Sequence, residues 1–181
     1  LDVSQSLTDL GAAAPNFIDA VGGVELSPDR PSGDLLGTTM IVRPNAGDLA
    51  SIIWSSDDRG PVVEGFQNNL ALGHLTLESS IFSLFEFMPS RPGAAIYVDV
   101  LEINGPLAES FDALTNGIIL GMNVYFSDVV STTPYTPITA ESLNGIFGPD
   151  APFNLIWVPA FVGPNSVEVT LGVNGATSRM N

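Results

Sequence analysis

Residues 79–88 read Ser-Ser-Ile-Phe-Ser-Leu-Phe-Glu-Phe-Met, and this stretch constrains the fold more than any other part of the chain. As an extended strand it carries apolar side chains on both faces, because neighbouring residues point to opposite sides. One face holds Ile81, Phe85 and Phe87, and the other holds Phe82, Leu84 and Met88. We therefore expect the second face to be covered by the N-terminal segment, by another layer of strands, or by a neighbouring subunit.

Similar short runs fill most of the chain on both sides of this stretch. They are rich in β-branched and aromatic residues and end at Gly, Pro, Asn or Asp, as strands do. The predicted strands are residues 35–43, 49–54, 61–66, 70–77, 79–88, 94–103, 118–126, 155–162 and 166–173. In the last of these, Val and Leu alternate with polar residues, so one face is expected to meet the core.

About eight short strands joined by Gly- and Pro-containing turns predict an all-β fold, an antiparallel β-sandwich of the single jelly-roll type. An immunoglobulin-like sandwich is the alternative, although the Cys, Trp, Cys spacing of that domain is absent. No sequence period of about 20 to 50 residues repeats, which disfavours solenoids and propellers.

The chain divides into an N-terminal arm or short helix over residues 1–34 and the jelly-roll sandwich over residues 35–181. The first of these segments places scattered apolar residues among Ala and Gly, a pattern that favours a helix or an arm over a strand. One further short helix is predicted over residues 139–147. Thr139 would cap its first turn, and Gly148 with the following Pro would end it.

The charge balance predicts a folded, strongly acidic surface. The 181 residues include 20 Asp and Glu against 5 basic residues, all of them Arg, and the net charge is −15. Because 45% of the residues are hydrophobic, a real core is expected rather than a disordered acidic tail. Short hydrated carboxylates without Lys suit a surface in concentrated salt, so we expect a halophilic source.

The composition also excludes several classes of function. Phosphate backbones need a basic stripe, so a nucleic acid is not expected as a partner. No run approaches the about 18 apolar residues of a membrane span. With no Cys, disulfides and thiolate metal sites cannot form. Without Lys, a phosphate-binding Gly-x-x-x-x-Gly-Lys-Ser/Thr loop is impossible.

His74 is the only histidine, and it lies in the predicted strand 70–77. A serine or cysteine hydrolase would need this residue for all its proton transfer, and no Gly-x-Ser-x-Gly nucleophile motif accompanies it. We therefore interpret His74 as a structural residue. The sequence predicts no enzyme, with no catalytic residue, no cofactor and no metal ligand.

The remaining candidate residues have structural interpretations that we prefer. Asp57 and Asp58, followed by Arg59 and Gly60, would form a turn, with a Ca²⁺ loop as the alternative. A glycosidase-like carboxylate pair among Glu86, Asp99 and Glu102 requires neighbouring strands. Most of the aromatic residues Phe82, Phe85, Phe87, Phe126, Trp157 and Phe161 are expected in the core rather than on a sugar-stacking platform.

A Lys-free acidic chain of this length, nearly all β, with two-sided apolar strands and no active site, resembles the single jelly-roll major capsid proteins of haloarchaeal icosahedral viruses with an internal membrane. The resemblance covers residues 35–173 and is one of size, strand number and acidity. It implies a structural protein of the virion that assembles with itself, and with a second capsid protein, into capsomers. It further implies a position near the viral membrane without insertion into it.

The alternative function is a secreted or cell-surface β-sandwich module of a halophilic archaeon that binds a sugar or a protein. Acidic sandwiches that carry aromatic residues do bind sugars, which keeps this alternative open.

The acidic surface leads to a first prediction. In dilute buffer the surface carboxylates repel one another without screening, so dialysis from molar NaCl should unfold or dissociate the protein. Circular dichroism along the salt series measures this, and an unchanged spectrum at low salt would refute the halophilic interpretation.

Overall fold

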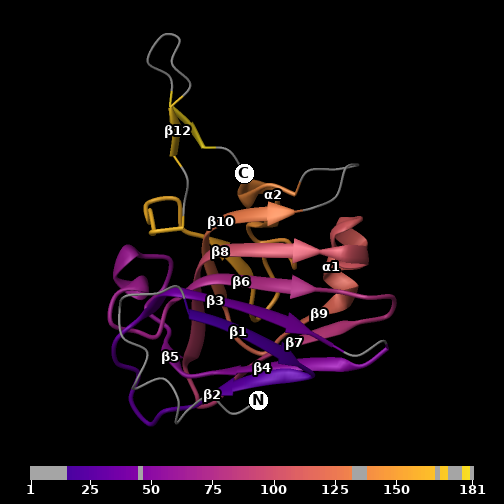
Figure 1. Cartoon of the computed structure of the whole chain (residues 1–181), viewed down its shortest axis with the longest axis horizontal. Coiled ribbons are helices and arrows are strands. Elements are labelled where there is room, and N and C mark those ends of the chain that lie inside the picture. Colours follow the sequence, from indigo (N-terminus) through magenta and orange to yellow (C-terminus); the bar gives the residue numbers. More distant parts are fainter. Residues whose placement is uncertain (1–15, 45–46, 132–137, 166–167, 171–176, 180–181) are drawn as a thin grey trace.

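Parallel strands in two sheets form the body of the protein (Figure 1). The computed structural model describes residues 16–44, 47–131, 138–165, 168–170 and 177–179. The large sheet has the order β1 (Asn16–Val21), β3 (Leu35–Arg43), β6 (Leu72–Glu78), β8 (Ala94–Asn104), β10 (Val124–Ser131) and β11 (Leu155–Trp157). The small sheet has the order β2 (Gly23–Leu26), β4 (Leu49–Trp54), β7 (Leu84–Pro89) and β9 (Ile118–Leu120).

Shorter elements complete the structure. β5 (Ser56–Asp57) pairs antiparallel with β8, while β12 (Glu168–Thr170) and β13 (Thr177–Arg179) form a separate antiparallel pair. In the described part of the chain, the helices are the 3₁₀ turns η2 (Val63–Phe66) and η3 (Gly105–Ala108) and the α-helices α1 (Phe111–Gly117) and α2 (Ala140–Leu143). Within the described residues, no helix has both the length and the apolar character needed to cross a membrane.

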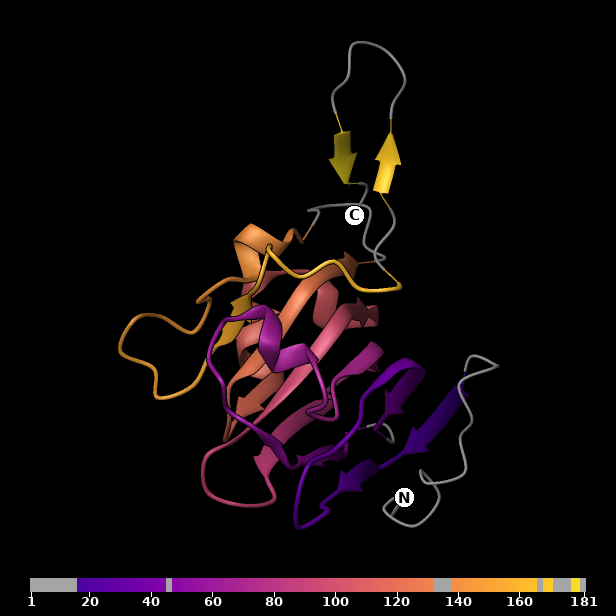
Figure 2. The ribbon, with the colours of Figure 1, turned by 90° about the vertical axis from the view of Figure 1, so that its left-hand side faces the viewer.

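Successive strands alternate between the two sheets, so the chain winds as a coil. From β1 it passes to β2 in the small sheet, returns to β3 beside β1, and passes on to β4 beside β2. Later turns repeat this path, and Figure 2 shows the two sheets side on as facing layers. Parallel neighbours need a long crossover. In α/β folds a helix supplies it, whereas here a strand of the other sheet does so in most turns.

The predicted antiparallel jelly roll is therefore wrong, because all neighbouring strands within the two main sheets, apart from the short β5, are parallel. The lack of a fixed sequence period, which disfavoured solenoids and propellers, does not exclude a coil whose turns differ in length. Asn16 pairs with Thr38, Thr39 with His74, and His74 with Val100, so successive turns have unequal lengths. Connections of unequal length hide the repeat from a search for a fixed period.

Apolar rows that face each other between the two sheets make the main core. In β4 the inward residues Ala50, Ile52 and Trp54 are fully buried, and β7 contributes the fully buried Phe85 and Phe87. Burial of each large side chain contributes about 2 kcal/mol. The alternating apolar residues in the sequence therefore locate these strands, but they do not show whether neighbouring strands run parallel or antiparallel.

A second, smaller cluster covers the outer face of the large sheet at one end. The loop that contains η2 and the segment after β11 bring Phe66 and Phe161 together as stacked rings, with centroids 3.9 Å apart. Beneath them, Tyr97 of β8 stacks on Tyr125 of β10 at 4.6 Å. At this end, apolar side chains are therefore buried on both faces of the large sheet. This is usual for a parallel sheet that is covered on both faces.

Residues 163–165 cross the large sheet and hold several turns of the coil together. The backbone N–H of Asn165 donates to the buried carboxylate of Asp99 at 3.0 Å, and its side-chain amide donates to the Leu36 carbonyl at 2.9 Å. Gly73 lies directly beneath, where a Cβ would collide with the Leu36 carbonyl and the Asn165 amide. Only glycine permits this close approach.

Four predicted strands match β3, β4, β6 and β8 closely, whereas residues 118–126, expected as one strand, contain β9 and the start of β10, which lie in different sheets. Strands β3 and β4 coincide with residues 35–43 and 49–54, and β8 with 94–103 to within a residue. Thr139 caps α2 in a capping box with Ser142, as predicted, although the helix is shorter than expected. Of the predicted strand 166–173, residues 168–170 are described and form β12; the rest lies outside the described residues.

Other expectations were wrong. Residues 16–21 and 23–26 are strands β1 and β2, where an arm or a short helix was expected, and residues 1–15 lie outside the described part. The predicted strand 61–66 is the turn η2, because Gly65 packs against the ring of Tyr97 and turns Phe66 into the smaller cluster. Helix α1 was missed.

Gly73 gives a test of the close crossing. Gly73→Ala should lower the free energy of unfolding by about 1–3 kcal/mol, because the added methyl group must displace backbone. Gly37→Ala is the matched control: this strand glycine has open space around its Cβ position, so a change below about 0.5 kcal/mol is expected. Urea unfolding followed by circular dichroism measures both, and equal effects would contradict the packing described here.

Candidate functional site

His74 lies on the outer face of the large sheet, in the central strand β6. Its Nε2 is 2.8 Å from the Glu102 carboxylate on β8, and Thr76 donates its hydroxyl proton to the same oxygen at 2.9 Å. The second oxygen of Glu102 accepts from the Asn104 amide at 3.0 Å. His74 is therefore a strand residue with a carboxylate partner, in agreement with the structural interpretation of its position.

Glu102 is the ionised centre of this group. Partial burial raises its pKa, but hydrogen bonds from Asn104, Thr76 and His74 outweigh that effect and hold the pKa below its usual value of 4.5. Each of its oxygens already accepts a hydrogen bond from a neighbouring side chain. The arrangement therefore orders the outer face of the sheet.

The carboxylates of Asp57 and Asp58 are occupied by protein groups. Asp57 pairs with Arg91, and Asp58 accepts from the Tyr125 hydroxyl at 2.8 Å and from the Asn123 amide at 3.1 Å. The backbone N–H of Gly60 also donates to Asp58 at 2.9 Å, which is an Asx turn. Among the described residues, no three His, Cys, Asp or Glu side chains are grouped as metal ligands.

This turn is fastened to the sheet by two tyrosines. Burial raises the pKa of Tyr97 and of Tyr125 well above the usual range, so both hydroxyls remain protonated donors. Tyr97 donates to the Gly60 carbonyl at 3.0 Å and accepts from the Arg59 N–H at 2.8 Å. The turn at residues 57–60 is thus hydrogen-bonded to two members of the smaller aromatic cluster, Tyr97 and Tyr125.

The structure does not bring Glu86, Asp99 and Glu102 together. Glu86 lies on the small sheet, where it accepts a hydrogen bond from Ser51. Asp99 is buried beneath residues 163–165, and Glu102 is bound to His74. A carboxylate pair for glycoside hydrolysis, which requires two acids facing one gap, is not formed by these residues.

The aromatic residues are mostly in the core, as predicted, with Phe82 as the exception. Phe85, Phe87 and Phe126 are fully buried, Phe161 is buried in the smaller cluster, and the half-buried Trp157 donates to the Ser127 carbonyl. The Phe82 ring, in contrast, is 85% exposed.

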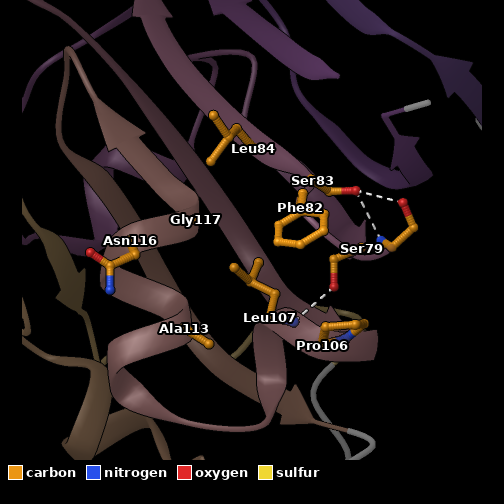
Figure 3. A pocket seen from close by; sticks show the side chains of 10 residues that line it. Ser79, Phe82, Ser83, Leu84, Pro106, Leu107, Ala113, Asn116 and Gly117 are labelled. Atoms are coloured by element: carbon orange, nitrogen blue, oxygen red, sulfur yellow. Dashed lines mark hydrogen bonds between the residues drawn. The ribbon is translucent and has the colours of Figure 1, made fainter. Parts of the chain in front are cut away.

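Phe82 stands at the mouth of an apolar cavity of about 480 Å³ (Figure 3). The cavity lies at the corner where strands of the large sheet end and strands of the small sheet begin. Its lining comes from the β6–β7 turn, from η3 and from α1, and consists of Ser79, Ser80, Phe82, Ser83, Leu84, Pro106, Leu107, Ala113, Asn116 and Gly117.

The turn before β7 holds Phe82 in an unusual backbone conformation. Its φ is +65°, in the left-handed region that bulky residues rarely adopt. Ser80 and Ser83 lock the turn: the Ser83 N–H donates to the Ser80 carbonyl at 3.1 Å, and the Ser80 N–H donates to the Ser83 hydroxyl at 2.9 Å. The ring is therefore kept in the solvent by the backbone, at a cost of about 1–2 kcal/mol.

The second wall of the cavity is anchored to the first through Ser79. Ser79 donates its hydroxyl proton to the Asn104 carbonyl at 2.6 Å and accepts from the Leu107 N–H at 2.9 Å, which fixes η3. Ser110 caps α1 by accepting from the Ala113 N–H at 3.0 Å. Gly117 lets the Leu107 side chain approach, since a Cβ there would collide with it. The cavity is thus preformed on a rigid frame.

The lining contains no charged side chain, so the cavity suits an uncharged apolar group. From the sequence, Phe82 was expected on an apolar face covered by another segment or subunit, and no cavity was predicted there. The clustered serines at positions 79, 80 and 83 were the available signal, since serine side chains favour turns over strand interiors.

Glu102 provides a pH test. Because its folded pKa is depressed, its contribution to stability is present above pH 4.5 and is lost as the pH falls through the folded pKa. Glu102→Gln should therefore lower the free energy of unfolding by about 1 kcal/mol at pH 7, with the difference disappearing below the folded pKa. Denaturant unfolding in a pH series from 7 downward measures this, and a difference that does not shrink as the pH falls below 4.5 would contradict it.

Comparison with known proteins identifies no relative: no family model, no curated protein sequence and no solved structure matches this chain.

Proposed function

We propose that this protein is a non-catalytic binding module that holds an apolar side chain of a partner protein in the cavity beside Phe82. The observation that carries the proposal is Phe82 itself, a large apolar ring that is 85% exposed at a φ of +65°. Strain of this kind persists where surrounding structure enforces it, and it concentrates at ligand-binding sites.

The dimensions of the cavity support this function. At about 480 Å³ it falls within the range of about 300–1,000 Å³ that is usual for binding pockets. Leu84, Pro106 and Leu107 supply apolar walls, and an entering side chain would be sandwiched between these walls and the phenyl ring. Aromatic anchors of this type contribute much of the binding free energy at protein interfaces.

A sugar is a poorer ligand for this cavity than an apolar side chain. The hydroxyls of Ser80 and Ser83 are hydrogen-bonded to each other at 2.8 Å, and Ser79 is bound to the Asn104 carbonyl and to the Leu107 N–H. Sugar hydroxyls that enter here would lose water without gaining comparable partners.

The capsid function is not part of this proposal. It was an expectation from a resemblance of size, strand number and acidity to single jelly-roll proteins, whereas this chain has parallel strands in two sheets rather than an antiparallel jelly roll. The binding-module alternative was likewise an expectation for a β-sandwich, and the present proposal rests instead on the exposed Phe82 ring and the cavity beside it.

The proposal predicts opposite effects on binding and on stability. Phe82→Asn should weaken binding of the neutral apolar dye Nile red about tenfold, because the aromatic wall is lost. The same change should leave the free energy of unfolding unchanged or raise it by about 1 kcal/mol, because Asn tolerates positive φ. Dye fluorescence and urea unfolding provide the two measurements.

Phe17→Asn is the matched control. Phe17 is 62% exposed but lies on β1 in the large sheet, so its loss should not change dye binding at the cavity. Dye affinity that stays the same in Phe82→Asn, or that falls equally in both variants, would refute the proposed site.

A further inference from the structure

We infer that the segment that docks beside Phe82 carries Lys or Arg next to its apolar side chain, and that it belongs to a different protein rather than to a second copy of this chain. This inference rests on the proposed function of the cavity. It adds the chemical character of the partner, which the charges around the cavity determine.

The apolar surface extends beyond the cavity over the outer face of the small sheet. Leu49 of β4 is the register partner of Leu84 of β7, and their side chains are 41% and 37% exposed. Ile119 of β9 is 45% exposed beside Glu86, and Ile81 is 66% exposed in the same turn as Phe82. A partner segment longer than one side chain therefore has apolar surface to cover.

Acidic residues border this surface. The carbonyl of Asp48 accepts from the Leu84 N–H at 3.2 Å, so Asp48 adjoins the start of β7. Glu86 lies two positions beyond Leu84 on the same face, and Asp112 adjoins Ala113 in the cavity wall. Glu109 lies in the connection between η3 and α1. Asp48, Glu109 and Asp112 are exposed, and Glu86 is half-buried.

Arginines do not neutralise this border in the described part of the chain. Arg43 is bound to Asp19 and Glu78 on the large sheet, while Arg59 and Arg91 pair with Asp57 at another part of the molecule. Within the described residues, none of Asp48, Glu86, Glu109 and Asp112 forms an ion pair. The surface is therefore an apolar centre with an uncompensated negative rim.

The charge of the rim selects between the possible partners. A second copy with the same patch would place carboxylates against carboxylates, in addition to the repulsion between two chains of net charge −15. A segment with Lys or Arg beside its apolar anchor would instead meet complementary charge around a desolvated centre, which is the usual arrangement of an apolar core and a polar rim.

Three fluorescein-labelled peptides test this inference by fluorescence anisotropy: Lys-Lys-Phe-Leu-Lys-Lys, Glu-Glu-Phe-Leu-Glu-Glu and Lys-Lys-Ser-Ser-Lys-Lys. The first should bind most tightly, and Phe82→Asn should weaken it about tenfold. The double variant Glu86→Gln/Asp112→Asn should weaken it about three- to tenfold, since each exposed charge contributes modestly. The assay starts at the lowest NaCl concentration at which circular dichroism shows the protein folded, and raising NaCl by a further 1 M should remove most of the effect of the double variant.

The outcomes separate this inference from the function on which it rests. If the acidic and basic Phe-Leu peptides bind equally and both depend on Phe82, the cavity binds apolar groups but the inferred basic partner is wrong. If the Ser-Ser peptide binds as well as the basic Phe-Leu peptide, attraction is purely electrostatic and the inference fails. If Phe82→Asn changes neither peptide nor dye binding, the proposed function itself fails.

Sedimentation of the protein alone over a concentration series tests the choice of a different protein as partner. A monomer that binds the basic Phe-Leu peptide supports the inference. A dimer that dissociates in Phe82→Asn but persists in Phe17→Asn would overturn it and identify a second copy as the occupant.

Discussion

Parallel pairing is the constraint on which the rest of this structure depends. In a parallel sheet every strand begins at the same end, so the chain must travel back after each strand before it can pair again. Here the return path runs through the second sheet, as from β3 through β4 to β6. Each return strand supplies apolar side chains to the space between the sheets, so the connection and the core are made by the same residues.

The strands were predictable where their side chains alternate. In β4, Ala50, Ile52 and Trp54 face the core, and the expected bounds were correct. Strand direction was not predictable, because an alternating pattern with one buried face is the same for parallel and antiparallel neighbours. Unequal connections, such as the loop with η2 between β4 and β6, concealed the coil.

The candidate site was partly visible in the sequence. The two-sided pattern of residues 79–88 placed Phe82 and Leu84 on a second apolar face that was expected to be covered, whereas both side chains are exposed. The serines at positions 79, 80 and 83 were the one sign that the strand begins only at Leu84, after a turn. The positive φ of Phe82 had no local signal, because the left-handed region is normally expected for Gly, Asn or Asp. The cavity walls from η3 and α1 depend on a crossover that only the fold reveals.

The position of the site at a corner of the coil has a consequence for how such a protein can change. Each wall of the cavity belongs to a different turn of the chain: residues 79–84 to one, and Pro106, Leu107 and α1 to the next. Because the sheets below are held by pairing and by the core, a corner segment can lengthen, shorten or be replaced while the strands keep their register. Ligand preference in this architecture can therefore evolve one corner at a time, and the corners offer separate sites for grafting a new specificity onto an unchanged frame.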